Sequence, residues 1–197
     1  AERRLMKLTA QAKLTPTEAQ AKSLKRTMEA ASAAANFASR LAWDNRVFGR
    51  VPLQKLVYYP IRQELGVSAQ SACLIVRKVA DAYKLDKKTI RKFRPLGAVA
   101  YDDRILAWKL DRQMVSIWTM DGRLTIPFVA GDYQTKLLQG QRGETDLVYR
   151  DGEFYLLSTC DVEEQPLTSQ DDFLGVDLGV VNIAVDSDGE IHSAKTV

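Results

Sequence analysis

The sequence lacks the features that mark a membrane-spanning or secreted protein. No apolar run in its 197 residues approaches the roughly 18 residues that a membrane-spanning helix needs. The N-terminal segment AERRLMKLTAQAKL contains no apolar core of the kind that a signal peptide carries. We therefore expect a cytoplasmic protein with no membrane partner. Its 46% hydrophobic content is ordinary for a folded chain with a core.

Cysteine and histidine are scarce, which bears on redox and zinc chemistry. The two cysteines, Cys73 and Cys160, lie far apart in apolar surroundings and form no Cys-x-x-Cys pair. Buried reduced thiols are therefore expected, and no zinc site or disulfide is predicted. The single histidine, His192, lies in a short polar segment that is predicted to be a strand. It is expected to be a surface residue, not a general base.

Acidic residues are scarce in the first part of the chain, and basic residues are scarce in the last part. Residues 1–143 contain 26 Lys and Arg against 12 Asp and Glu, whereas residues 144–197 contain 2 against 13. A basic portion of this size is typical of binding to a phosphate backbone, and an acidic portion repels nucleic acid unless metal ions intervene. The alternative is that both portions are merely solvated faces, but the asymmetry favours nucleic-acid binding.

The first 14 residues predict a strand, at 5–14, which leads into a well-marked helix. Thr15 matches a helix N-cap, Pro16 suits the first helical position, and Glu18 completes a capping box. Apolar and mostly small residues recur along this helix at helical spacing until it ends near 43–46. Such a stripe allows neighbouring helices to approach closely.

Two further helices follow and complete a predicted three-helix bundle. The second is expected at about 53–65, ended by Gly66 and kinked or broken at Pro60. Ser68 is the predicted N-cap of the third, whose apolar stripe continues to Tyr83.

The end of the third helix and the segment after it are strongly basic. Only Asp81 and Asp86 oppose the cations there, and the aromatic residues Tyr83 and Phe93 lie between them. This density favours a surface that follows a nucleic-acid backbone over an ordinary solvated helix face. The candidate backbone-binding residues are Arg77, Lys78, Lys84, Lys87, Lys88, Arg91, Lys92 and Arg94.

The pattern changes from helical to extended at 95–97 and predicts a small antiparallel barrel. Short alternating runs are joined by the hairpin turns Asp121-Gly122 and Asp151-Gly152. The strand at 5–14 needs a partner in this sheet, so the bundle is expected to be an insertion into the barrel. Residues 163–170 are predicted to be a linker. The predicted elements are strands at 105–110, 115–120, 124–128, 147–150 and 154–160 and a helix at 133–138.

The stretch FLGVDLGVVNIAVDSDG, residues 173–189, places a carboxylate inside an apolar strand. Two more strands, at 182–185 and 191–193, are expected around the turn Asp188-Gly189. A buried carboxylate is costly unless it is satisfied. Asp177 is therefore either bonded to backbone amides or is a ligand for a hard divalent cation; the residues alone leave both open.

In this order of elements, nearly the whole chain resembles the N-terminal half of TnpB (OrfB-type), the transposon-encoded RNA-guided DNA endonucleases related to type V CRISPR effectors. The segments that carry the resemblance are LTPTEAQ, KVADAYKLDKKT, AYDDRILAWKL, DLVYRDGEFYLLSTCDV and, above all, FLGVDLGVVNIAVDSDG.

The resemblance implies an α+β fold in four regions. The first strand of a wedge β-barrel is at 1–14, an inserted helical recognition domain at 15–94, the rest of the barrel at 95–165, and the first strands of an RNase H-like RuvC nuclease domain at 166–197. It also implies guide RNA and target double-stranded DNA as partners, in a prokaryotic cytoplasm.

The same resemblance assigns residue roles. Asp177 would be the first catalytic carboxylate and a ligand in a two-metal Mg²⁺ site. Gln70, Tyr101 and Asp102 would recognise the short DNA motif that flanks the target, in which a glutamine can bond an adenine edge. Asp186 and Asp188 are nearby but are expected to be solvated turn residues. Family members supply further carboxylates from later motifs, so we expect these 197 residues alone not to cut DNA.

Two other functions compete with this one. A non-catalytic RNA-guided DNA-binding protein would use the same bundle and barrel. An actin-like nucleotide-binding enzyme also contains Gly-x-Asp-x-Gly, but Val180 and Val181 stand here where a phosphate-binding turn favours Ser or Thr.

Overall fold

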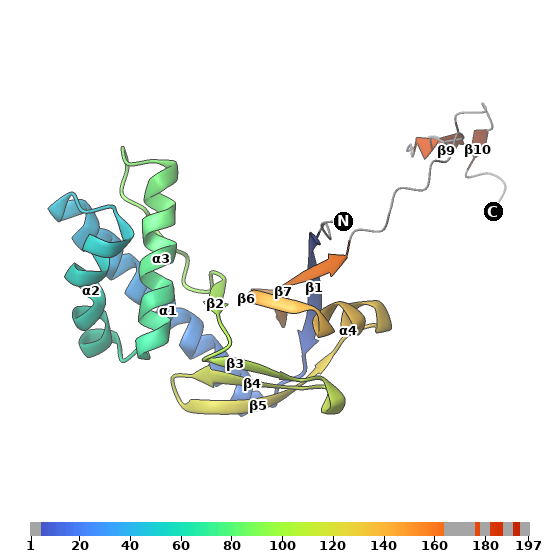
Figure 1. Ribbon diagram of the computed structural model, residues 1–197, viewed down its shortest axis with the longest axis horizontal. Helices are drawn as coiled ribbons and strands as arrows, with labels where there is room; N and C mark the ends of the chain where they lie inside the picture. The colour runs from blue at the N-terminus through green and yellow to red at the C-terminus, as the bar shows by residue number, and fades with distance from the viewer. Residues whose placement is uncertain (1–4, 164–175, 178–181, 187–190, 194–197) are drawn as a thin grey trace. The chain divides into compact units, whose positions relative to one another are not determined.

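The computed structural model describes residues 5–163, 176–177, 182–186 and 191–193. The chain divides into two units, Ala1–Glu163 and Glu164–Val197. The first contains a helical bundle and a barrel-like sheet, so the described fold is α+β, as predicted (Figure 1).

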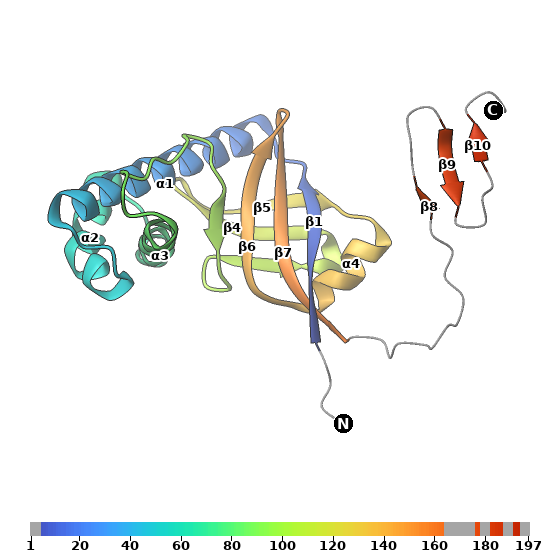
Figure 2. The ribbon, with the colours of Figure 1, turned by 90° about the horizontal axis from the view of Figure 1, so that it is seen from above.

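The barrel is an antiparallel sheet of seven strands in the order β2-β6-β7-β1-β5-β4-β3, and it nearly closes on itself (Figure 2). Side chains of β7 alternate between half-buried and buried, which puts one face in the core, as the period of a strand requires. The strands are β1 (Leu5–Leu14), β2 (Val99–Tyr101), β3 (Leu106–Lys109), β4 (Met114–Thr119), β5 (Gly122–Val129), β6 (Gln141–Arg150) and β7 (Glu153–Glu163).

The predicted barrel strands are confirmed, with longer bounds for the last hairpin. Strand β2 was not predicted as a separate element, because three residues are too few to show alternation. A short 3₁₀ helix, η1 (Leu110–Arg112), was also missed. The predicted helix at 133–138 is α4 (Asp132–Gln139), which packs against β1 and β7.

Three helices lie between β1 and β2 in the chain, so the bundle is an insertion into the barrel as expected. They are α1 (Glu18–Asn45), α2 (Arg50–Leu65) and α3 (Ala69–Leu85). Small side chains of α1, among them Ala34, Ala35 and Ala38, are fully or almost fully buried against α2 and α3. Of the kink or break expected at Pro60, the break does not occur: α2 continues through this residue to Leu65.

Helix α1 begins at a different N-cap residue from the one predicted. The N-cap is Thr17, not Thr15, and its capping box is closed by Gln20, with Thr17 N–H donating to Gln20 Oε1 at 3.0 Å and Gln20 N–H donating to Thr17 Oγ1 at 3.3 Å. Thr15 instead extends the pairing of β1, because its N–H donates to the Pro127 carbonyl at 2.9 Å. The other predicted caps are confirmed: Ser68 begins α3, and Gly66 ends α2 with φ +68°.

Helix α1 joins the barrel to the bundle (Figure 2). Near its start, Leu24 and Met28 belong to the barrel core, whereas Ala35 and Ala38 further along belong to the bundle core. The Ser23 hydroxyl also donates to the Thr119 hydroxyl at 2.9 Å across this contact. One continuous helix therefore fixes the bundle relative to the barrel.

The second unit contains the described strands β8 (Val176–Asp177), β9 (Asn182–Asp186) and β10 (Ile191–Ser193), in the order β10-β9-β8. The strands predicted around Asp177 are thus present. Asp186 ends β9 instead of lying in the turn. The predicted Asp188-Gly189 turn lies outside the described residues, as does the linker beyond Glu163.

Among the described residues, the helices are too short or too polar for any of them to cross a bilayer. Both cysteines are free thiols, Cys160 buried and Cys73 half-buried. Burial raises the pKa of the Cys160 thiol, which favours its protonated form.

Candidate nucleic-acid interface

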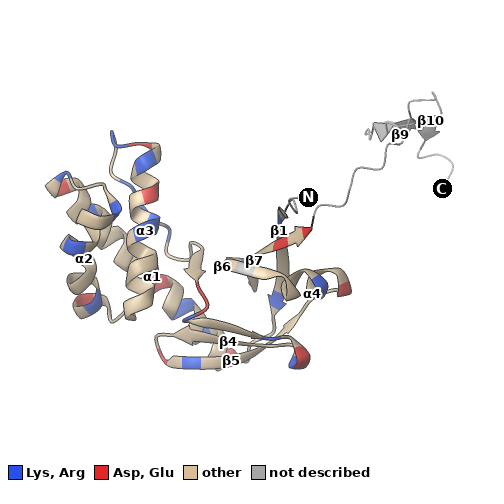
Figure 3. Ribbon diagram, viewed as in Figure 1, with Lys and Arg blue, Asp and Glu red and all other residues tan. Residues whose placement is uncertain are grey.

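The basic segment predicted from the sequence is the end of α3 and the irregular connection of residues 86–98 that leads to β2. Figure 3 shows Lys and Arg gathered at this end of α3 and along the connection. We call residues 86–94 the basic loop. Since it has no regular hydrogen-bonded structure, its shape depends on side-chain contacts.

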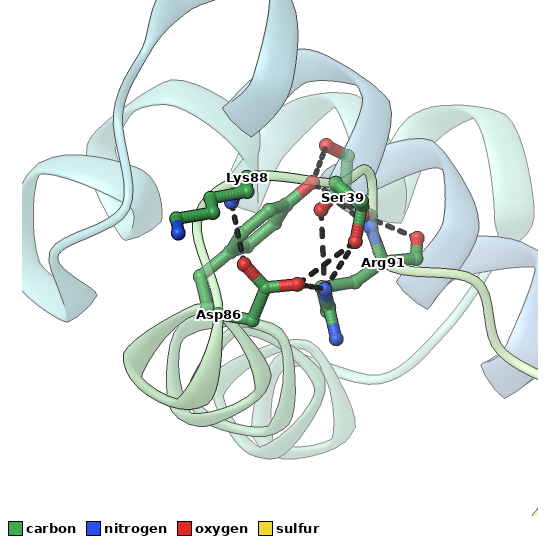
Figure 4. A network of polar contacts seen from close by, with 6 residues as sticks. Ser39, Asp86, Lys88 and Arg91 are labelled. Carbon is green, nitrogen blue, oxygen red and sulfur yellow. Dashed lines mark hydrogen bonds and ion pairs between the residues drawn. The ribbon is translucent and has the colours of Figure 1, made fainter.

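Asp86 closes the basic loop on itself (Figure 4). Its carboxylate accepts a hydrogen bond from the Lys88 backbone N–H at 2.6 Å and a second from the Thr89 hydroxyl at 3.0 Å. It also forms an ion pair with Arg91. These contacts, the Lys88 N–H first, lower the pKa of Asp86 below its ordinary value. The carboxylate is therefore ionised at neutral pH and holds the turn from 86 to 91.

Two side chains of α1 and one of α3 anchor the loop to the bundle. The fully buried Tyr83 donates from its hydroxyl to the Ser39 carbonyl at 3.0 Å and accepts from the Arg91 N–H at 3.3 Å. The Ser39 hydroxyl donates to the Arg91 carbonyl at 2.6 Å. Asn36 brackets Phe93, accepting from its N–H at 2.8 Å and donating to its carbonyl at 2.9 Å. The loop is therefore held at both residues 91 and 93.

The cations that this arrangement leaves free are exposed. Lys87, Lys88, Lys92 and Arg94 all face solvent, and within residues 5–163 none of their side chains makes a hydrogen bond or ion pair. Lys84 is also exposed but pairs with Asp81 at 2.6 Å. The geometry thus presents four uncompensated positive charges from a fixed backbone.

The positive surface extends beyond the predicted residues to the α1–α2 turn. Phe48 in this turn contacts Tyr83, with ring centroids 4.6 Å apart and ring planes tilted by 40°, which places the turn beside the end of α3. Arg46 and Arg50 in and after the turn are exposed. The sequence reading missed both because each stands alone outside the dense run of cations.

Three of the predicted backbone-binding cations have internal partners instead. Arg91 is in the Asp86 network, Arg77 forms an ion pair with Glu144 on β6, and Lys78 donates to the Ala98 carbonyl. The Glu144 hydrogen bond raises the pKa of Arg77, whereas burial lowers the pKa of Lys78. Arg77 and Lys78 thereby fasten α3 to the barrel side, whereas Arg91 acts within the basic loop.

A groove of about 490 Å³ beside Arg77 and Lys78 carries charges of both signs. Burial raises the pKa of Asp146 in its wall, and Glu144 adds to that effect. Its three carboxylates outnumber its two cations, which makes the groove a poor site for phosphate. Its lining residues are Leu74, Arg77, Lys78, Asp81, Ala98, Ala100, Glu144 and Asp146.

The structure brings together two of the three residues expected to recognise DNA. Gln70, in the first turn of α3, donates from Nε2 to the Asp102 carboxylate, and its Oε1 accepts from Arg104 Nη1 at 2.9 Å. Asp102 also accepts from the Arg104 backbone N–H at 3.1 Å. Arg104 is an exposed cation of this cluster that the sequence reading overlooked, although it follows Asp102 by only two residues.

Tyr101, the third expected recognition residue, lies in the barrel core. It is 1% exposed, and its hydroxyl donates to the Trp118 carbonyl at 3.1 Å. Burial raises the pKa of this phenol beyond any physiological value. These contacts give Tyr101 a structural role across the nearly closed edge of the barrel and leave no side-chain surface for a base.

Asp177 lies in β8, where its backbone pairs with Val185, and Asp186 on β9 is opposite Val176. Directly opposite residues share a face and neighbouring positions alternate, so Asp177 and Asp186 occupy opposite faces of this small sheet. Among the described residues, no group of three or more His, Cys, Asp or Glu side chains is placed to hold a metal ion.

Comparison with known proteins gave no further assignment. No family model matches the chain, and no curated protein is significantly similar to it.

Proposed function

We propose that this chain binds a guide RNA and target double-stranded DNA as part of an RNA-guided DNA endonuclease of the TnpB type, in the prokaryotic cytoplasm. The observation that carries the proposal is the anchored basic loop: four exposed, unpaired cations on a backbone held by Asp86, Tyr83 and Asn36. An ordinary solvated charged segment needs no such anchoring. A fixed backbone lowers the entropy lost when the lysines meet phosphates.

Within this proposal the basic loop binds the RNA backbone, and the Gln70–Asp102–Arg104 cluster contacts the DNA motif. Both the carboxamide of Gln70 and the guanidinium of Arg104 have hydrogen-bonding groups suited to base edges in the major groove. Asp102 and Arg104 orient the Gln70 amide through its Nε2 and Oε1. The cluster therefore offers a defined donor and acceptor pattern.

The second unit would be the start of an RNase H-like RuvC domain, with Asp177 as a metal ligand. Mg²⁺ bound there would supply the water activation and charge stabilisation that phosphodiester hydrolysis uses. Asp177 would contribute a carboxylate ligand. The backbone of Asp177 is held in β8 by its pairing with Val185.

Removal of the loop charges tests the proposal. We expect a Lys87→Gln, Lys88→Gln, Lys92→Gln variant to bind single-stranded RNA more weakly and with a smaller salt dependence. Each lost phosphate contact lowers the slope of log K against log salt by about 0.7, so a change of about 2 is expected if all three lysines make contacts. Fluorescence anisotropy over a range of KCl concentrations measures both quantities.

The matched control removes the same charge elsewhere. Lys109, Arg112 and Lys136 are exposed, and they lie near η1 and on α4, which contact each other. Their triple glutamine variant should keep at least most of the RNA affinity and slope. Equal losses of RNA affinity in the two variants would mean that only the net charge of the protein matters, and would contradict the proposed interface.

A further inference from the structure

Helix α2 exposes an apolar and aromatic face that the bundle does not use. Leu53, Val57 and Ile61 are fully buried toward α1 and α3. On another face Val51 and Tyr59 are 66% and 67% exposed, and Lys55, also exposed, lies one helical turn from each. Val51, Lys55 and Tyr59 therefore form one exposed stripe along α2, with the lysine between two large apolar side chains.

The face is hollowed into a groove of about 290 Å³. Its aromatic wall consists of Tyr58 and Tyr59, whose rings meet edge to face with centroids 5.1 Å apart. Arg62 lies over the Tyr58 ring at 5.5 Å and donates to its hydroxyl at 3.4 Å, which fixes that ring. Tyr59 is 67% exposed, so a planar group can approach its ring. The groove is lined by Val51, Gln54, Lys55, Tyr58 and Tyr59.

The charge of the groove selects an anionic occupant. Lys55 is the only charged residue in its lining, and within the described part of the chain its ammonium group has no partner. The groove begins next to Arg50, which belongs to the positive surface at the α1–α2 turn. An aromatic face beside cations is the combination that binds single-stranded nucleic acid, with a base on the ring and its phosphate on the cation.

Gln54 gives a reason to prefer RNA over DNA. Its Nε2 donates to the Cys73 thiol at 3.8 Å, which directs the carboxamide, while its Oε1 accepts no hydrogen bond within residues 5–163. A 2′-hydroxyl is a donor that only RNA supplies.

We propose that the α2 groove binds one unpaired nucleotide of single-stranded RNA, with its base stacked on Tyr59, its phosphate at Lys55 and its 2′-hydroxyl at Gln54. This inference deepens the proposed function, because it adds a stacking site to the electrostatic contacts of the basic loop.

The test uses the full chain and a short RNA that carries the fluorescent base 2-aminopurine at one position at a time. Stacking on an aromatic ring quenches this base. We expect one position to be quenched in the wild type, and expect Tyr59→Ala to remove that quenching and weaken binding roughly tenfold. Tyr59→Trp should restore both. The control is Tyr133→Ala, because Tyr133 on α4 is 63% exposed and outside the groove.

The possible outcomes separate this inference from the proposed function. If the RNA binds with a salt dependence that the loop lysines control, but Tyr59→Ala leaves quenching unchanged, the stacking site is wrong and the interface stands. If the RNA does not bind at all, both fail. DNA of the same sequence bound as tightly as RNA would contradict RNA as the occupant. Saturable binding of a peptide and not of RNA would show a protein-docking groove instead.

Discussion

At the scale of single residues, Asp86 determines the shape of the basic loop. Because contacts with Lys88, Thr89 and Arg91 lower its pKa in the folded chain, its contribution to loop stability is fully present above the ordinary carboxyl value of about 4. The contribution is lost only as the pH falls through the lower folded pKa. At neutral pH the loop is therefore fully held by this carboxylate.

Replacement of Asp86 by alanine separates positioning from charge. The change removes a negative charge from a phosphate-binding surface, so electrostatics alone predicts tighter RNA binding. We expect weaker binding, by several-fold, since the turn that aims Lys87 and Lys88 is lost. The comparison variant is Asp44→Ala, which removes an exposed carboxylate of α1 outside the network. Anisotropy that shows tighter binding for both variants would contradict a positioning role for Asp86.

The sequence identified the basic run but not which of its members are free. Arg77 and Lys78 follow the same pattern as Lys87 and Lys88, yet they are half-buried because β6 and the start of β2 lie against α3. Glu144 is 67 positions further along the chain from Arg77, so no local pattern reveals the pair. No local pattern reveals the burial of Tyr101 either, since that burial depends on β4.

At the scale of elements, the helices were predicted well because their caps are local. Ser68 and Gly66 act through contacts within a few residues. The N-cap of α1 was predicted wrongly because Thr15 and Thr17 both head plausible capping boxes, and the pairing of Thr15 with Pro127 decides between them. That contact spans more than a hundred residues.

Helix α2 tolerates Pro60 in its interior, at a cost. Proline supplies no N–H for the Leu56 carbonyl and is about 3 kcal/mol less favourable than alanine in a helix interior. We expect Pro60→Ala to raise the free energy of unfolding by about 1–3 kcal/mol, measured by urea denaturation. Gln63→Ala, an exposed change in the same helix, should alter it by less than about 0.5 kcal/mol. An unchanged or lower stability of Pro60→Ala would mean that the proline ring is needed for packing.

At the scale of the whole molecule, an inserted bundle could unfold separately from the barrel that contains it. Each has its own core, and the polypeptide enters and leaves the bundle at β1 and β2. The two are coupled because α1 contributes Leu24 and Met28 to one core and Ala35 and Ala38 to the other. The continuity of this helix therefore positions the bundle, and with it the basic loop, relative to the barrel.

A break in the middle of α1 should therefore uncouple the two parts. Ala33 is exposed, so Ala33→Pro interrupts the helix without leaving a cavity in either core. In a Trp43→Phe background the tryptophan fluorescence comes from Trp108 and Trp118 in the barrel region, while far-ultraviolet circular dichroism follows mainly the helices. We expect the two probes to give coincident urea transitions in the parent and separate ones in Ala33→Pro, with the helical signal lost first. Ala33→Gly costs only about 1 kcal/mol and should keep the transitions coincident. Coincident transitions in the proline variant would show that contacts of α3 with the barrel, and not the continuity of α1, hold the two parts together.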